Sequence, residues 1–282
     1  MYASKGPVVE EWADRRFFRP LGWRIATALL PTPISADAVT FASLVLGVLA
    51  GHLFWYRSAS VNAAGILLFI VSDVLDSADG QLARLRGSST RMGRILDGLA
   101  DTGRFLSLYG HLGARLYVAH GRSGAVLALA ALLSHSYQAA AADFIRQAYL
   151  HFAVGSGSEL DVSAQSATPE STSFWSRLSA WIYGDYVRRQ AWLFPRTTAL
   201  ARSLAGRDVP ASLRRSWAER QRSVVQGCAL IAQNIRWLLL ALTTVPHWPS
   251  AYCWIVVGPL NVVLVLLILV HEREPKYHAQ LA

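Results

Sequence analysis

The feature of this 282-residue sequence that most constrains its fold is a series of long apolar segments. A helix that spans a bilayer needs about 20 largely apolar residues. Six segments meet or approach this requirement, at residues 37–56, 62–82, 95–118, 124–145, 223–245 and 250–270. The third segment is the weakest, because it is interrupted by Asp97, Asp101, Arg104, His111 and Arg115. We therefore expect an all-α polytopic membrane protein with six transmembrane helices.

The composition excludes two other classes of protein. Apolar residues make up 53% of the chain and charged residues 16%, whereas soluble domains carry about 25% charged residues. This apolar content excludes a disordered chain, and two cysteines, Cys228 and Cys253, are too few for a disulfide scaffold. The net charge of +9 indicates anionic headgroups or phosphate-bearing substrates, or it reflects membrane topology alone.

The distribution of basic residues predicts the orientation in the membrane. Arginines gather in the N-terminal segment, in the link between the second and third apolar segments, and in the link between the fourth and fifth. The opposite side has only Arg57, Arg115 and Arg122. Because cytoplasmic loops carry the excess of Lys and Arg, we expect both termini to face the cytoplasm. The bias toward Arg over Lys and toward Ala favours a bacterial inner membrane over an endoplasmic-reticulum membrane.

The N-terminal region differs from the apolar segments. Residues 8–30 mix aromatic and apolar residues with arginines, which is typical of an amphipathic helix in the membrane interface. An ordinary cytoplasmic capping helix is the alternative. Pro31 and Pro33 end this helix. We expect four regions: an interfacial segment at 1–33, transmembrane helices 1–4 at 34–153, a cytoplasmic linker and basic insertion with one or two short helices at 154–221, and transmembrane helices 5–6 with a cytoplasmic tail at 222–282.

Four carboxylates lie near the cytoplasmic ends of the second and third apolar segments. Asp76 and Asp79 are three residues apart, and Asp97 and Asp101 are four apart, so each pair shares one helix face. The short link makes the two helices antiparallel neighbours, and the four side chains can then converge just inside the membrane. Since intramembrane carboxylates are costly, they indicate a functional site.

The chemistry of this cluster favours a divalent metal ion. Four carboxylates cannot stay ionised together without cations, and hard oxygen ligands suit Mg²⁺, Mn²⁺ or Ca²⁺. Four carboxylates can hold two ions about 4 Å apart, a spacing that phosphoryl-group enzymes use. Gly80, Ala83 and Gly93 leave room for a ligand, and Arg84 can pair with a phosphate.

Three further residues are candidates for ligand binding. Asp73, one turn before Asp76, contacts a nucleotide base or sugar, orients a ligand, or pairs with an arginine. Asp143 and Arg146 fall at the inner end of the fourth apolar segment, on the same membrane face as the aspartates. Arg146 can bind an anionic part of an acceptor, or it can be a positive-inside residue at a helix end.

The run from Asp76 to Asp101 resembles the signature of the CDP-alcohol phosphotransferase family, D-x-x-D-G-x-x-A-R-x8-G-x3-D-x3-D. All eight fixed positions match, at Asp76, Asp79, Gly80, Ala83, Arg84, Gly93, Asp97 and Asp101. The six-helix layout and the interfacial N-terminal helix are also similar to family members. The insertion at 154–221 has no counterpart that helps the comparison.

The resemblance implies an enzyme that moves a substituted phosphate from a CDP-linked alcohol to an acceptor hydroxyl and releases CMP. It implies that Asp76, Asp79 and Asp97 bind metal ions, two of Mg²⁺ or Mn²⁺, and that Asp101 accepts the proton of the acceptor and also touches metal. It further implies a cytidine site lined by Gly80, Ala83 and Gly93, with Arg84 near the phosphates. Homodimers are frequent in the family, so a homodimer is expected in the bilayer.

Several functions remain open at this point. The favoured donor is CDP-diacylglycerol, with a small polar alcohol or alcohol phosphate as acceptor; the alternative is transfer of a CDP-choline or CDP-ethanolamine headgroup to diacylglycerol or ceramide. A cation or proton-coupled transporter is an alternative of another class, although no inverted repeat is visible. The intact motif argues against a non-catalytic scaffold. The basic residues match the cytoplasmic side of a membrane protein, so we expect no nucleic-acid partner.

Overall fold

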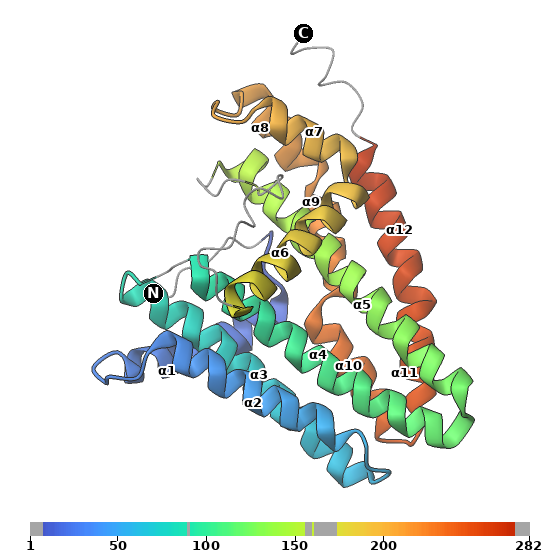
Figure 1. Ribbon diagram of the computed structural model, residues 1–282. Helices are drawn as coiled ribbons and strands as arrows, with labels where there is room; N and C mark the ends of the chain where they lie inside the picture. The colour runs from blue at the N-terminus through green and yellow to red at the C-terminus, as the bar shows by residue number, and fades with distance from the viewer. Residues whose placement is uncertain (1–7, 89–90, 156–159, 161–173, 274–282) are drawn as a thin grey trace. The chain divides into compact units, whose positions relative to one another are not determined.

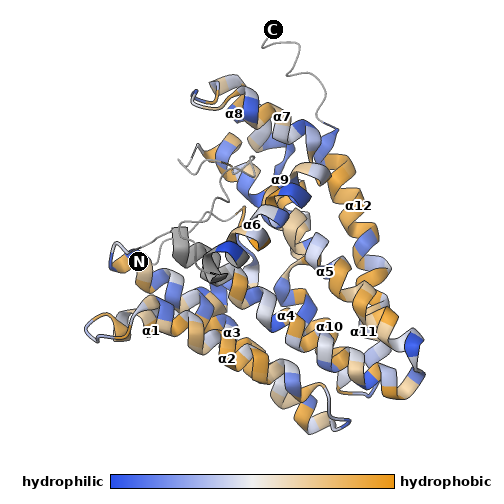
Figure 2. Cartoon of the chain, in the orientation of Figure 1, coloured by the Kyte–Doolittle hydropathy of each residue, from blue (hydrophilic) through white to orange (hydrophobic). Residues whose placement is uncertain are grey.

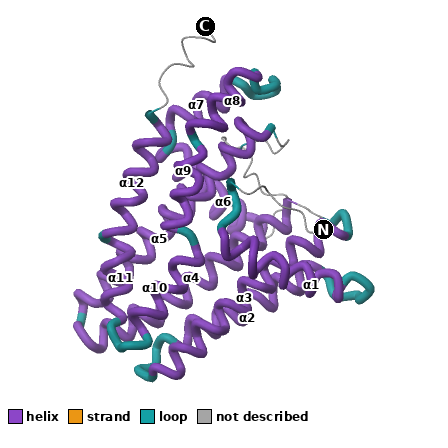
Figure 3. The backbone as a smooth tube through the Cα atoms, turned by 180° about the vertical axis from the view of Figure 1, so that it is seen from behind, coloured by secondary structure: helices purple, strands orange, loops and turns teal. Residues whose placement is uncertain are grey.

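The computed structural model describes residues 8–88, 91–155, 160 and 174–273, without the side chains of 91–97, 174–176, 178 and 179. All regular structure in these ranges is helical (Figure 3), which confirms the all-α expectation. The helices, labelled as in Figure 1, are α1 Arg19–Leu29, α2 Ala36–Leu53, α3 Ala59–Leu85, α4 Arg91–His120, α5 Arg122–Tyr149, α6 Phe174–Leu193, α7 Pro195–Ser203, α8 Ala211–Arg220, α9 Arg222–Gly227, α10 Gln233–Thr244, α11 Pro249–Val257 and α12 Pro259–Glu272. Short π-helices at Asp14–Phe18 and Leu150–Val154 adjoin α1 and α5, and a 3₁₀ turn at Cys228–Ile231 follows α9.

The protein is an integral membrane protein. Five helical segments are long and apolar enough to cross a bilayer, at Ala36–Leu53, Ala59–Leu85, Arg122–Val154, Arg222–Thr244 and Pro249–Glu272. The remaining expected span corresponds to α4, whose 30 residues extend about 45 Å but do not include a stretch as apolar as those of the other five. Figure 2 shows this contrast between the mostly hydrophobic α12 and the mixed surface of α4.

The last two apolar segments are not the continuous helices that the sequence predicts. The first is interrupted at Ala232, whose backbone is extended with φ −87° and ψ 173°. The second is interrupted at Gly258, with φ −93° and ψ −93°, directly before Pro259. Proline has no N–H to donate, and its ring forces the preceding residue out of the helical region. Such breaks are tolerated in membranes where neighbouring protein groups satisfy the backbone.

The chain forms two compact units. The first contains Glu10–Ser134 and Asn234–Val257, and the second contains the described residues of 8–9, 135–233 and 258–273. Within the second unit, the insertion forms three helices, α6 to α8, rather than the one or two short helices expected. The longest of them is the 20-residue α6, which contains no proline and ends two residues before Pro195. The expected polar linker lies almost entirely outside the described residues, and the four-region division stays a prediction.

In the first unit, α2 packs along both α3 and α4, and α1 lies against α3 (Figure 1). The contact between α1 and α3 depends on Gly22. A Cβ atom added there would lie 2.7 Å from Ser77 Oγ and 2.9 Å from the Ser77 carbonyl carbon. Ala26 of α1 and Leu82 of α3 continue this contact as fully buried core residues. The expected N-terminal helix is therefore present, and it is held by close packing on the helix that carries the aspartates.

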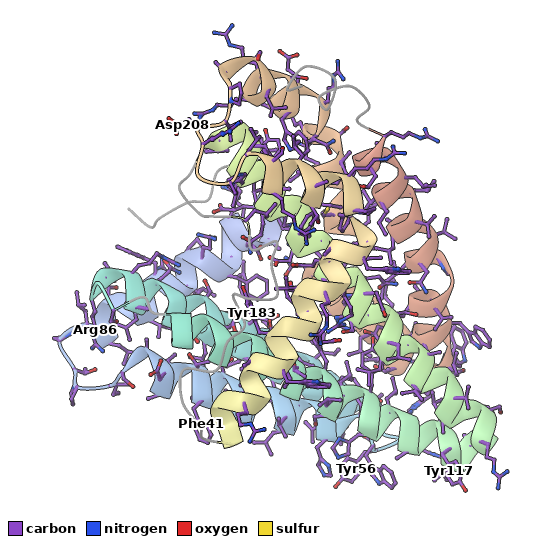
Figure 4. All side chains as sticks on the ribbon, turned by 45° about the horizontal axis from the view of Figure 1, so that its top comes forward. Phe41, Tyr56, Arg86, Tyr117, Tyr183 and Asp208 are labelled. Carbon is purple, nitrogen blue, oxygen red and sulfur yellow. The ribbon has the colours of Figure 1, made fainter. Side chains whose placement is uncertain are left out.

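The loop between α1 and α2 is fastened by Arg86, directly after α3. Its guanidinium donates hydrogen bonds to the carbonyl oxygens of Leu29 at 2.9 Å, Thr32 at 2.8 Å and Ile34 at 2.5 Å. These include the last carbonyl of α1, which has no partner within its own helix. Figure 4 shows Arg86 at one end of this unit, with Tyr56 and Tyr117 at the other. The helix α2 begins after the N-cap Ser35, whose Oγ accepts a hydrogen bond from Ala38 N at 3.1 Å.

Candidate active site

Three aspartates lie at successive turns of α3, Asp73 and the motif residues Asp76 and Asp79, and the motif residue Asp101 lies on α4. Asp79 is buried with 6% of its surface exposed, whereas 32% of the Asp76 side chain is exposed. Asp101 of α4 is the most open, with 47% of its side chain exposed. The backbones of both helices pack mainly against α2 rather than against each other, so side chains make the link between the two acidic helices.

That link is Arg104 of α4, whose buried guanidinium meets three carboxylates. Its Nη1 lies 3.1 Å from Asp73 Oδ1, and its Nη2 lies 3.0 Å from Asp76 Oδ1 and also pairs with Asp101 Oδ1. Nη1 donates a further hydrogen bond to Ser72 Oγ at 3.0 Å. The structure therefore brings Asp73, Asp76 and Asp101 together around one fixed positive charge.

The space for Arg104 is made by small residues of α2. A Cβ atom added at Gly47 would collide with Cγ and Cδ of Arg104. Beside it, Ser72 Oγ donates to the Ser43 carbonyl oxygen at 2.8 Å, so α2 and α3 lie close together at this level. The arginine stem is thus enclosed between α2 and α3, and only its head reaches the aspartates.

Asp73 has a second partner from a distant part of the chain. Trp237 of α10 donates its indole N–H to Asp73 Oδ2 at 2.5 Å, and its ring stacks on Phe69 with the ring centroids 4.1 Å apart. Both carboxylate oxygens of Asp73 are therefore hydrogen-bonded. Of the roles considered for Asp73, the structure displays the pairing with an arginine, and the contact with a nucleotide stays a prediction.

Asp79 contrasts with Asp73. Its Oδ2 atom is buried and has no hydrogen-bond partner among the described residues. Burial of an anionic oxygen without a partner has a large cost in free energy. Carboxylate oxygens are good ligands for hard divalent cations, which would compensate this cost. The next residue, Gly80, has no side chain, and a Cβ atom there would lie 3.6 Å from the Arg84 guanidinium. The donor chemistry at this point fits a metal ion beside a phosphate.

Within the described part of the chain, no group of three or more His, Cys, Asp or Glu side chains could hold a metal ion by itself. Asp97 and Gly93 lie in the first turns of α4, but the Asp97 side chain is outside the described residues. Ala83 is half-buried and Arg84 is exposed at the end of α3. The metal-binding and CDP-binding roles of these residues stay predictions.

The two acceptor candidates belong to the second unit. Asp143 of α5 accepts a hydrogen bond from Tyr186 of α6 at 2.8 Å, and Gln190 Nε2 lies 3.5 Å from the same oxygen. Arg146 is half-buried one turn further along α5. The contact between Asp143 and Tyr186 joins the insertion to α5, and an acceptor-binding role for Asp143 and Arg146 stays a prediction.

Sequence reasoning missed two residues of the site. In the sequence, Arg104 stands out as a charge that weakens a membrane span, although an intramembrane arginine is itself a signal of function. Its place three residues after Asp101 also put both on one helix face. Trp237 gave no signal, because it lies 164 residues from Asp73 in the sequence and tryptophan is common in membrane proteins.

These features define an integral membrane protein with a partly buried acidic site between two of its helices. Residues 34–166 match the family model described as CDP-alcohol phosphatidyltransferase, so this part of the chain is similar to that family. All eight motif positions fall inside the matched range. The family is generally dependent on a divalent metal ion.

The names of similar proteins are consistent with the family model that matches this chain. Phosphatidylinositol phosphate synthases of Mycobacteroides abscessus and Mycobacterium marinum are 34% and 32% identical over 95 and 132 residues, covering 31% and 46% of this chain. A CDP-diacylglycerol–inositol 3-phosphatidyltransferase of Drosophila melanogaster is 38% identical over 65 residues, or 23% of this chain. The matches cover 39%, 52% and 27% of the relatives, so the chain spans about half of their length or less.

Proposed function

We propose that this protein is a membrane transferase that moves a substituted phosphate from a CDP-alcohol to an acceptor hydroxyl in phospholipid biosynthesis. The phosphoanhydride bond of the CDP-alcohol breaks, a phosphodiester bond to the acceptor oxygen forms, and CMP leaves. The observation that carries the proposal is the convergence of Asp73, Asp76 and Asp101 inside the stretch that matches the family. The buried, unpartnered oxygen of Asp79 supports it.

In this proposal Asp76, Asp79, Asp97 and Asp101 hold two divalent cations, Mg²⁺ or Mn²⁺. Such ions neutralise the diphosphate and stabilise the departing CMP. Asp101 takes the proton of the acceptor hydroxyl as a general base, and its exposure, the largest among Asp73, Asp76, Asp79 and Asp101, leaves it accessible to a substrate. The Arg84 guanidinium, beside the open backbone of Gly80, pairs with phosphate oxygens. Gly80, Ala83, Gly93 and Asp73 line the cytidine site.

The favoured substrates are CDP-diacylglycerol and a small polar alcohol or alcohol phosphate. Two of the similar proteins are named phosphatidylinositol phosphate synthase and a third is a CDP-diacylglycerol–inositol 3-phosphatidyltransferase. An inositol phosphate is therefore the first acceptor to test, with Asp143 and Arg146 as its contacts. We further propose a homodimer in a bacterial inner membrane, with the active site and both termini on the cytoplasmic side.

Release of CMP from the purified full chain tests the reaction. One assay contains CDP-diacylglycerol with a pool of small alcohols and alcohol phosphates, and the other contains CDP-choline and CDP-ethanolamine with diacylglycerol and ceramide. Asp97→Asn and Asp101→Asn are expected to lose activity, whereas Asp208→Asn, a change at an exposed residue of the second unit, retains it.

Acceptor-dependent CMP in the first assay, lost in both variants, would support the proposal, and mass spectrometry of the lipid would name the acceptor. Activity in the second assay alone would show that the donor is a CDP-linked headgroup and not CDP-diacylglycerol. If no CMP is released in either assay and CDP does not bind in the presence of Mn²⁺, the proposal is contradicted and a transporter is favoured.

A further inference from the structure

The transfer reaction does not require a buried arginine among its metal-binding carboxylates. A cation in this place repels a metal ion, so Arg104 needs an explanation of its own. We propose that Arg104 is the internal counter-cation of the site, which pairs with Asp76 and Asp101 while no metal is bound and yields both to the metal. The inference rests on the metal binding included in the proposed function.

The chemistry of the guanidinium suits this role. Buried carboxylates without a cation repel one another and lose solvation. Arginine stays charged under all conditions in proteins and presents five N–H donors in a planar fork. One such group can therefore hold several carboxylates in fixed positions while the metal is absent.

The contacts of Arg104 divide into two sets. Nη1 binds the deeper groups, Ser72 and Asp73, and only 15% of the Asp73 side chain is exposed. Nη2 binds Asp76 and Asp101, the two more exposed carboxylates. The second set contains predicted metal ligands and the first does not. The guanidinium can therefore release the ligands and keep its hold on Ser72 and Asp73.

The packing of the arginine stem limits how far this exchange can go. Gly47 and the Ser43–Ser72 contact enclose the stem between α2 and α3. The head is consequently held within reach of both sets of groups, and it returns to Asp76 and Asp101 when the metal leaves. A permanent structural ion pair would use the same contacts but would be indifferent to metal.

Metal titrations of Arg104→Gln separate these two cases, with Arg115→Gln as the matched control. Arg115 lies on the same helix with 5% exposure, and its Nη1 donates to neutral groups, Asn62 Oδ1 at 2.9 Å and Tyr56 O at 3.0 Å. The unfolding midpoint is measured in detergent with chelator, with Mg²⁺ and with Mn²⁺, and Mn²⁺ affinity is measured by electron paramagnetic resonance.

We expect Arg104→Gln to lower the midpoint in chelator and to bind Mn²⁺ about tenfold or more tightly than the unmodified protein, because the competing charge is gone. The metal then raises its midpoint by more than it raises that of the unmodified protein. Arg115→Gln lowers the midpoint but responds to metal as the unmodified protein does. Arg104→Lys retains the competition and a normal Mn²⁺ affinity.

An unchanged metal response in Arg104→Gln would overturn the inference. Absence of any metal response in the unmodified protein would instead overturn the metal site of the proposed function. If Arg104→Gln does not fold, the charge-balanced variant Arg104→Gln/Asp73→Asn makes the same comparison. It is expected to bind Mn²⁺ more tightly than the unmodified protein although the summed charge of the site is unchanged, and equal or weaker binding would refute the competition.

Discussion

Trp237 donates its indole N–H to Asp73, and through this bond α10 is joined to the acidic face of α3. The bond occupies the carboxylate oxygen that Arg104 does not. Asp73 therefore has a cation at one carboxylate oxygen and a neutral N–H donor at the other. The stacked ring pair of Trp237 and Phe69 keeps the indole in place.

Replacing Trp237 by Phe is expected to remove this hydrogen bond while keeping the aromatic stack. A buried carboxylate oxygen then loses its donor, which costs about 1–3 kcal/mol of the free energy of unfolding. Denaturant titration in detergent measures the loss. Phe69→Leu is the complementary change, since it weakens the aromatic stack and keeps the indole N–H donor. A loss of less than about 0.5 kcal/mol in Trp237→Phe would argue against the hydrogen bond, because this is the low end for an ordinary hydrogen bond.

Replacing Gly47 by Ala is expected to destabilise the protein, because the new methyl group collides with the Arg104 stem. Overpacking of this kind costs about 1–3 kcal/mol. Gly110→Ala of α4 is the control, since nothing lies within 4 Å of a Cβ atom there. That substitution should raise stability by about 0.5–1 kcal/mol through helix propensity. Equal effects of the two changes on the unfolding midpoint would contradict the close contact.

Replacing Asp79 by Asn should raise the stability of the protein without metal and reduce the stability that the protein gains from metal. In chelator, loss of a buried and unpartnered negative oxygen raises the free energy of unfolding by about 1–3 kcal/mol. With Mg²⁺, the variant lacks a ligand and gains little or no stability from the ion. Unfolding midpoints measured in chelator and over a series of Mg²⁺ concentrations test both expected changes in stability. A variant that Mg²⁺ stabilises as strongly as the unmodified protein would exclude Asp79 as a metal ligand.

Replacing Glu272 by Gln should loosen the end of α12 within the second unit. The Glu272 carboxylate accepts from Arg196 N at 2.8 Å, from Thr197 N at 3.1 Å and from Thr197 Oγ1 at 2.7 Å. It therefore caps the N-terminus of α7, where negative charge is favoured. Loss of the charge costs about 1–2 kcal/mol, measured by denaturant titration. The exposed Glu219 gives the control Glu219→Gln, which should change stability little.

Much of the fold could be predicted because the membrane imposes simple rules. The apolar segment at 62–82 corresponds to Ala59–Leu85, since the length of a span follows from the thickness of the bilayer. The break at Pro259 carried a visible signal that the high hydropathy of the segment outweighed, whereas the break at Ala232 carried none.

The arrangement around the aspartates was only partly predictable. The spacing of Asp76 and Asp79 placed them on α3, but the partners of Asp73 are 31 and 164 residues away. Burial of a charge depends on such distant partners, so neither Arg104 nor Trp237 could be assigned from local sequence. Side chains that face each other across helices are specified by packing, which one sequence does not display.

Arg86 has two separate roles. Its positive charge contributes to the orientation of the protein in the membrane, and a lysine would supply this charge equally well. The folded protein also uses the planar fork that binds the carbonyl oxygens of Leu29, Thr32 and Ile34, and a lysine has no such fork. A lysine at this position would therefore give a protein inserted in the correct direction with an unfastened first loop, so the steps of topogenesis and folding can be separated at a single residue.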